Sequence, residues 1–387
     1  MNHSLKHFFF LVAIGLFLWS CSDKKPSRDE KKTQVKGFAF KIQEGLMQGR
    51  VGILDLHFDK QAFVNRVTND AFWDEELKKL GNETYKPEYK TQLLRELTLA
   101  GMFLSGVDGK SYFAYDSVKT YRIEDRWHAV FRMYANGAIN YHDYILRVDS
   151  NKVWIEDVYV MTIGKRLSLV MQEAYVAGIP DANNYGLHRD QQLLLKAKYY
   201  LDNAQHQRSL ATFDSISFNY RNQKSMRLFR LQILSNIPNE QYVRELEKFE
   251  AEFPNEAGTI LLQMDKNFLY GNYPAVLKNI ARLEAMYGKD PVLTYMEANA
   301  QNLLGKCALA GTLYQEVLTS KPDWEMPAIN WINCLLKENK YQKAIGVIEQ
   351  YKSNFAFTPT YVKYLFKEQT GFLISTEFKE WKTQQDP

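Results

Sequence analysis

This chain of 387 residues carries little net charge, and it lacks the sequence motifs of the common enzyme classes. Its formal charge of +4 comes from residues of interleaved sign, which gives no electrostatic basis for binding nucleic acid. The sequence contains no Gly-x-Ser-x-Gly elbow, no Gly-rich phosphate loop and no His-Glu-x-x-His helix. We therefore expect neither an enzyme activity nor a cofactor.

Cysteine is equally scarce, because the chain has only Cys21, Cys307 and Cys334. Their spacing is not that of metal ligands, so we expect no metal site. Cys307 and Cys334 either form a disulfide in an oxidising compartment or are small buried residues of packed helices. In contrast, apolar residues make up 45% of the chain and aromatic residues 14%, which is ample core material for two domains or for one domain and a repeat array.

The first residues have the layout of a secretory signal, with Lys6 followed by an apolar run from Phe8 to Leu18. This run is too short for a bilayer core, which needs about 20 apolar residues. Directly after it, Leu18-Trp19-Ser20-Cys21 resembles the lipobox of bacterial lipoproteins, although Trp19 departs from the usual small or apolar residue. The resemblance implies that residues 1–20 are removed and that Cys21 is acylated and becomes the first residue. An ordinary cleaved signal and an uncleaved anchor helix are the alternatives.

The segment after the cysteine predicts the location of the protein. Lipoproteins retained at the inner membrane typically have aspartate after the cysteine, so Ser22 favours the outer membrane, on its periplasmic face or on the cell surface. Residues 21–36 are almost entirely polar, and they predict a flexible tether between the lipid and the folded part.

Residues 37–178 predict an α+β domain with a four-stranded antiparallel sheet. Periodicity favours helices at 60–70, 88–104 and 167–176, and strands at 111–121, 126–135, 138–149 and 152–161. The dipeptide Asn136-Gly137 is the favoured two-residue hairpin turn, which indicates a meander with helices on one face. Helices followed by a curved antiparallel sheet resemble the NTF2-like fold in element order alone.

Residues 190–352 show a helical period with a longer repeat on top of it. The triplets Gly271-Asn272-Tyr273, Gly305-Lys306-Cys307 and Asn339-Lys340-Tyr341 recur at one constant interval. They resemble the inter-helix turn of tetratricopeptide repeats, whose period is about 34 residues, and small or apolar residues follow at the family's positions. The resemblance implies an all-α solenoid of about five helix pairs, with earlier turns near Gln205 and Asn239, closed by capping helices over residues 353–387.

A cluster on the third and fourth predicted strands is the first candidate site. We expect His142 and His128 to lie on one concave surface of the sheet together with Asn140 and Tyr144. This surface would form a pocket for a small ligand. The competing interpretation is a set of cross-strand polar and aromatic pairs. A Ser-His-Asp set can be written from Ser168, His142 and Asp157, but no motif fixes its geometry.

The second candidate site is the concave groove of the repeats, where Tyr200, Arg227, Arg230 and Tyr295 are possible binding residues. Most aromatic residues at helical spacing are core, which is the alternative for each of them. We expect a membrane-anchored scaffold or assembly factor of the cell envelope that binds an unknown protein or peptide through its repeats. The alternative is an enzyme or small-ligand receptor with a pocket in the α+β domain.

Overall fold

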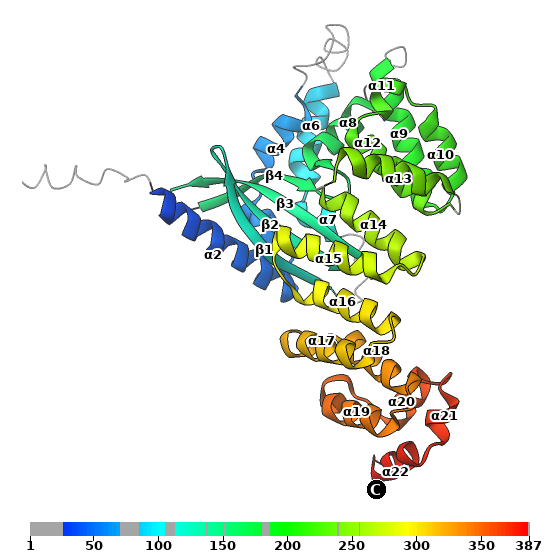
Figure 1. Cartoon of the computed structure of the whole chain (residues 1–387). Helices are drawn as coiled ribbons and strands as arrows, with labels where there is room; N and C mark the ends of the chain where they lie inside the picture. The colour runs from blue at the N-terminus through cyan, green and yellow to red at the C-terminus, as the bar shows by residue number, and fades with distance from the viewer. Residues whose placement is uncertain are drawn as a thin grey trace, which may run out of the picture.

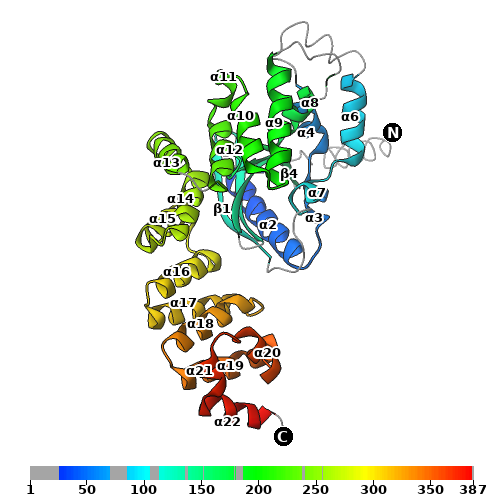
Figure 2. The same ribbon diagram turned by 90° about the vertical axis from the view of Figure 1, so that its right-hand side faces the viewer.

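In the computed structural model, an antiparallel sheet near the N-terminus is followed by a long series of helices (Figures 1 and 2). The residues described are 26–69, 85–104, 113–135, 138–150, 152–177, 179, 186–237, 240–254 and 256–385. The predicted signal peptide, the lipobox and Cys21 lie outside the described residues.

The first described element is helix α2, Arg28–Met47, and it begins inside the segment predicted to be a tether. Its start has a physical cause, because Ser27 and Glu30 form a capping box in which each side chain bonds the other residue's backbone N–H. Val35 on this helix is fully buried against the sheet. The prediction of a flexible tether is therefore wrong for residues 28–36.

The sheet is an antiparallel meander in chain order. Its strands are β1 Ala114–Ile123, β2 Arg126–Ala135, β3 Ala138–Asp149, β4 Lys152–Val160 and β5 Lys165–Arg166. The first four match the predicted strands within a few residues, but the sheet has five strands, not four. The added strand was missed because two residues are too short to show a period. The predicted Asn136-Gly137 turn lies outside the described residues, and Ala135 and Ala138 on either side of it are paired.

One face of the sheet is covered by the early helices. These are α2, α3 Ile53–His57, α4 Lys60–Val67, α6 Tyr85–Glu96, α7 Leu99–Leu104 and α8 Leu167–Ala177. The single helix expected over 88–104 is split into α6 and α7. The Thr98 hydroxyl accepts a hydrogen bond from the Gly101 N–H at 3.1 Å, which is the contact that begins a new helix.

The helical part runs from α9 to α22. Its helices are α9 Gly186–Asp202, α10 His206–Asp214, α11 Phe218–Arg221, α12 Lys224–Ser235, α13 Glu240–Glu252, α14 Ala257–Leu269, α15 Tyr273–Tyr287, α16 Pro291–Leu303, α17 Cys307–Ser320, α18 Glu325–Lys337, α19 Tyr341–Phe355, α20 Pro359–Leu365, α21 Thr370–Ile374 and α22 Thr376–Gln385. The three best-matched pairs repeat as their turns predict, because α15, α17 and α19 begin at equal intervals, at Tyr273, Cys307 and Tyr341.

The turns between paired helices share one backbone feature. Gly271, Gly305 and Asn339 all have positive φ, between 56° and 74°, and they occupy the same place in successive repeats. Glycine and asparagine tolerate this conformation better than other residues, which explains why the repeated triplets begin with them. Next to these turns, Cys307 on α17 and Cys334 on α18 form a disulfide with Cα atoms 5.7 Å apart.

The other face of the sheet is buried by the helical part, which the sequence did not indicate. Val130, Tyr134 and Tyr141 from the strands share a hydrophobic cluster with residues of α14 to α17. In both views the sheet lies against α14 to α16, whereas α18 to α22 extend away from it (Figures 1 and 2). The sheet is therefore sandwiched between two helical layers.

Candidate binding surfaces

The predicted pocket at His142 is filled by side chains of the protein itself. The His142 ring stacks on Phe103 at 4.2 Å and hydrogen-bonds the Tyr115 hydroxyl at 3.1 Å and Asn140 Nδ2 at 3.2 Å. The Tyr115 hydroxyl also bonds the Tyr144 hydroxyl at 2.6 Å. His142 is 1% exposed, and burial lowers its pKa to about 3, so the ring is neutral at physiological pH. The arrangement is that of a satisfied core histidine.

His128 does not share this surface, so the prediction that the two histidines face each other is wrong. In the register of β2 and β3, His128 pairs with Ile145, whereas His142 pairs with Phe131. Directly paired residues lie on the same face, so His128 and His142 are on opposite faces of the sheet. His128 Nδ1 lies 3.0 Å from Asp143 Oδ2, and its ring stacks on Tyr121 at 4.7 Å.

The Ser-His-Asp set is also not assembled. The Ser168 hydroxyl donates to Asp157 Oδ2 at 2.5 Å, with both residues buried, while His142 bonds Tyr115 and Asn140 instead. The Asp157 carboxylate also accepts backbone N–H bonds, and its role is to hold the start of α8 against β4. No proton relay through His142 is possible in this arrangement.

Tyr295, a predicted groove residue, lies in the interface between the helical part and the sheet. Its ring centroid is 4.4 Å from that of Trp324, which in turn lies 5.0 Å from Tyr134 on β2. Nearby, Tyr287 stacks on Tyr141 of β3 at 4.5 Å. The chain's own sheet therefore occupies the surface that Tyr295 was predicted to present to a peptide.

The other predicted groove residues lie on the first helix pairs. Arg227 and Arg230 come together at a cavity of about 460 Å³, where Arg227 pairs with Glu252 and Arg230 with Asp214 and Glu245. Tyr200 on α9 is partly exposed and does not line this cavity, and the Lys196 ammonium lies 5.9 Å from its ring centre. Two of the four predicted residues therefore lie together on α12, and their charges are matched by carboxylates of the neighbouring helices α10 and α13.

A larger cavity, of about 690 Å³, lies among the C-terminal helices. It is lined by Lys352, Thr358, Pro359, Thr360, Lys363, Leu373, Phe378, Lys379, Lys382 and Gln385, a set named here the C-terminal lysine pocket. Four lysines line it together with two large apolar side chains, and its lining includes no carboxylate. Sequence reasoning missed this site because its lysines come from α19, α20 and α22, which are adjacent only in the fold.

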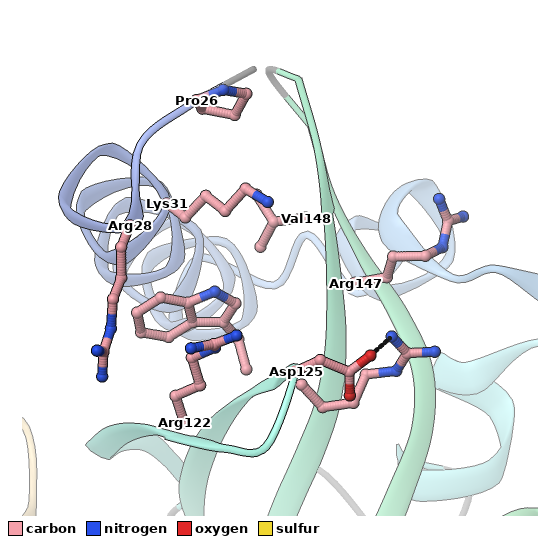
Figure 3. A pocket seen from close by; sticks show the side chains of 9 residues that line it. Pro26, Arg28, Lys31, Arg122, Asp125, Arg147 and Val148 are labelled. Atoms are coloured by element: carbon pink, nitrogen blue, oxygen red, sulfur yellow. Dashed lines mark hydrogen bonds and ion pairs between the residues drawn. The ribbon is translucent and has the colours of Figure 1, made fainter.

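A second basic site lies at the start of α2, and Figure 3 shows its side chains. The N-terminal basic notch has a volume of about 380 Å³ and is lined by Pro26, Arg28, Lys31, Arg122, Asp125, Arg126, Trp127, Arg147 and Val148. Arg28 and Lys31 come from α2, whereas Arg122, Asp125 and Arg147 come from the ends of the strands and the β1–β2 turn (Figure 3). Five cationic side chains surround one carboxylate.

Comparisons with known protein families, curated proteins and solved structures find no match to this chain. The resemblances of the chain to tetratricopeptide lipoproteins and of residues 37–178 to the NTF2-like fold therefore remain predictions. Within the described residues, no helix is long and apolar enough to span a bilayer. In the same part of the chain, no group of three or more His, Cys, Asp or Glu side chains is arranged to hold a metal ion.

Proposed function

We propose that this protein is an exported lipoprotein, anchored to the outer membrane through Cys21, whose C-terminal helices bind a protein partner. Two observations support the anchor. Leu18-Trp19-Ser20-Cys21 resembles a lipobox, and the Cys307–Cys334 disulfide is chemistry typical of oxidising compartments outside the cytoplasm. The multiple acyl chains that such a cysteine receives give stable membrane attachment, whereas a single chain binds only marginally.

The helix pairs support a tetratricopeptide-type array, because their starts and their positive-φ turns recur at the interval typical of that family. Arrays of this kind present extended surfaces to peptides and proteins. Here the sheet packs against α14 to α17, so the free binding surface is the part of the array that follows them (Figure 1).

The main support for a protein partner comes from the C-terminal lysine pocket. Lys363, Lys379 and Lys382 surround the apolar side chains of Leu373 and Phe378, and the cavity of about 690 Å³ is in the size range of ligand sites. A lysine-rich rim over an apolar floor complements a peptide segment that has carboxylates on both sides of a large apolar residue. The partner we propose is therefore a protein with an exposed acidic segment of this kind.

The binding test uses a labelled peptide in which four aspartates flank one leucine. We expect the protein to bind it, and the Lys363→Gln/Lys379→Gln/Lys382→Gln variant to bind at least about tenfold more weakly, a change of about 1.4 kcal/mol. The matched control replaces Lys248, Lys278 and Lys343, exposed lysines on α13, α15 and α19, by glutamine. Equal binding by the two triple variants, or equal binding of a peptide with lysines in place of the aspartates, refutes the proposed surface.

The anchor is tested separately in cells. Mass spectrometry of the amino-terminal peptide is expected to show Cys21 as the acylated first residue, and Cys21→Ala is expected to leave the protein unacylated and the signal uncleaved. An unmodified thiol at position 21 of the wild-type protein contradicts the anchor and leaves the peptide test unaffected.

A further inference from the structure

The cations of the N-terminal basic notch fall into two groups. Arg126 and Arg147 are matched by carboxylates, since both lie about 3.1 Å from Glu156, and Arg147 also pairs with Asp59 and Asp149. These ion pairs hold the two guanidinium groups in place and leave little charge for a ligand.

Arg28, Lys31 and Arg122 form the second group. Within the described residues, no ion pair to a carboxylate is found for any of the three, and Arg28 and Arg122 are exposed. The nearby Glu30 is engaged in the capping box of α2. The notch therefore presents three uncompensated positive charges, two of them guanidinium groups, whose planar set of donors matches the oxygens of a phosphate.

The position of the notch in the chain relates it to the membrane. Pro26 lines the notch and lies five residues after Cys21, and a fully extended chain spans at most about 3.6 Å per residue. If Cys21 carries the lipid, the notch lies within about 18 Å of the acyl chains, whatever path the chain takes. The headgroup layer of each leaflet is itself roughly 5–8 Å thick.

We propose that the N-terminal basic notch binds the phosphate-bearing headgroups of anionic lipids in the membrane to which Cys21 is anchored. This inference rests on the proposed lipid anchor, which brings the notch to the membrane surface. Clusters of basic residues close to a membrane are attracted to anionic lipids, and the attraction falls off within a Debye length. Headgroup binding fixes the orientation of α2 against the bilayer and directs the C-terminal lysine pocket away from it.

The test uses the unacylated mature chain from Ser22 onward, so that headgroup binding is measured without the lipid anchor. This chain retains every described element, because the first of them, α2, begins at Arg28. Its binding is measured by co-flotation with vesicles of mixed phosphatidylglycerol and phosphatidylcholine, and with vesicles of phosphatidylcholine alone. We expect binding to the anionic vesicles only, weakening as salt is raised.

The decisive variant is Arg28→Gln/Lys31→Gln/Arg122→Gln. Each basic residue near an anionic surface contributes about a fivefold increase in binding, so the triple variant is expected to lose on the order of a hundredfold. The Lys248→Gln/Lys278→Gln/Lys343→Gln protein has the same net charge and is expected to bind within about twofold of wild type. Circular dichroism of both variants confirms that they remain folded.

Three results overturn the inference: equal binding by the notch variant and wild type, an equal loss in the control variant, or equal binding to both kinds of vesicle. A competition experiment distinguishes lipid headgroups from free phosphate as the ligand. Inorganic phosphate is added at the same concentration as the phosphate of the vesicles. Displacement of the protein from vesicles by free phosphate identifies a soluble-anion site and refutes the lipid as ligand. None of these outcomes depends on whether Cys21 is acylated, so they are distinct from a failure of the proposed anchor.

Discussion

Arg132 on β2 forms an ion pair with Asp290, the N-cap residue of α16, and thereby joins the sheet to the helical array. The Arg132 side chain is fully buried and also pairs with Asp116 of β1, which in turn lies 2.8 Å from the Lys321 ammonium. Asp290 accepts the backbone N–H groups of Val292 and Leu293 at 2.9 and 3.1 Å. Arg132 therefore contacts a carboxylate in each of the two parts, and together with Lys321 it balances the charges of Asp116 and Asp290.

Replacing Arg132 by alanine is expected to lower the free energy of unfolding by about 3–5 kcal/mol, because it leaves the buried Asp290 without its cation and Asp116 with Lys321 alone. Urea denaturation measures the change. Arg244→Ala is the control, since Arg244 makes an exposed pair with Glu240 on a helix surface and its loss is expected to cost less than about 1 kcal/mol. Similar effects of the two substitutions contradict a structural role for the buried network.

The packing of α14 on the end of β4 depends on Gly258. A Cβ at this position would lie 2.5 Å from the Met161 carbonyl oxygen, so Gly258→Ala forces the helix away from the strand and is expected to destabilise by about 1–3 kcal/mol. The same substitution at Gly346 on α19 meets nothing within 4 Å and is expected to stabilise by about 0.5–1 kcal/mol through helix propensity. Thermal unfolding of the two variants measures the sign of each change in stability. A stabilising effect of Gly258→Ala would refute the close approach of Gly258 to the Met161 carbonyl oxygen.

The sequence analysis did not predict the contact of Arg132 with Asp290 or the close approach of Gly258 to Met161. Strand and helix positions followed from local periodicity, and the repeated triplets predicted the turns at Gly271, Gly305 and Asn339. The contact of Arg132 with Asp290 joins residues far apart in the chain, and no local pattern encodes it. The structure shows the effect of this contact in the strands themselves, because β2 and β3 bury residues on both faces, as sheets covered on two sides do.

Two errors about individual residues were avoidable from the sequence. A two-residue turn at Asn136-Gly137 pairs Ala135 with Ala138, and counting back along both strands places His128 and His142 on opposite faces. Ser27 and Glu30 have the spacing of a capping box, which predicts a helix start inside the supposed tether. The C-terminal lysine pocket and the N-terminal basic notch have no such signal, because their cations come from separate elements.

The Cys307–Cys334 disulfide closes a loop with a sequence separation of 27 residues. By the loop-entropy relation, such a cross-link stabilises the folded state by about 3.5 kcal/mol, so reduction is expected to lower the urea midpoint accordingly. The Cys307→Ala/Cys334→Ala variant serves as the control, because its stability is expected to be the same with and without reductant. A wild-type midpoint that does not respond to reductant shows that the two thiols are not linked in solution.

The buried His142 makes stability depend on pH. Burial lowers its pKa from the usual 6.5 to about 3 in the folded state, so between these values the unfolded chain binds a proton that the folded protein does not. The neutral His142 makes its full contribution to the free energy of unfolding above pH 6.5. Below that, the free energy of unfolding falls by about 1.4 kcal/mol per pH unit as the pH decreases toward 3.

Carboxylates also titrate over part of this range, so the measured quantity is the difference between wild type and His142→Phe, which keeps an aromatic ring beside Phe103. Asp265, whose pKa burial raises to about 6, contributes equally in both proteins, so between pH 6.5 and 5 urea denaturation is expected to give a steeper loss of stability for the wild type than for the variant. The variant is expected to be less stable at pH 7, because the Tyr115 hydroxyl loses a partner, and that offset does not affect the slope. Equal slopes would mean that His142 accepts a proton without unfolding, and the enclosed core around it would then have to open.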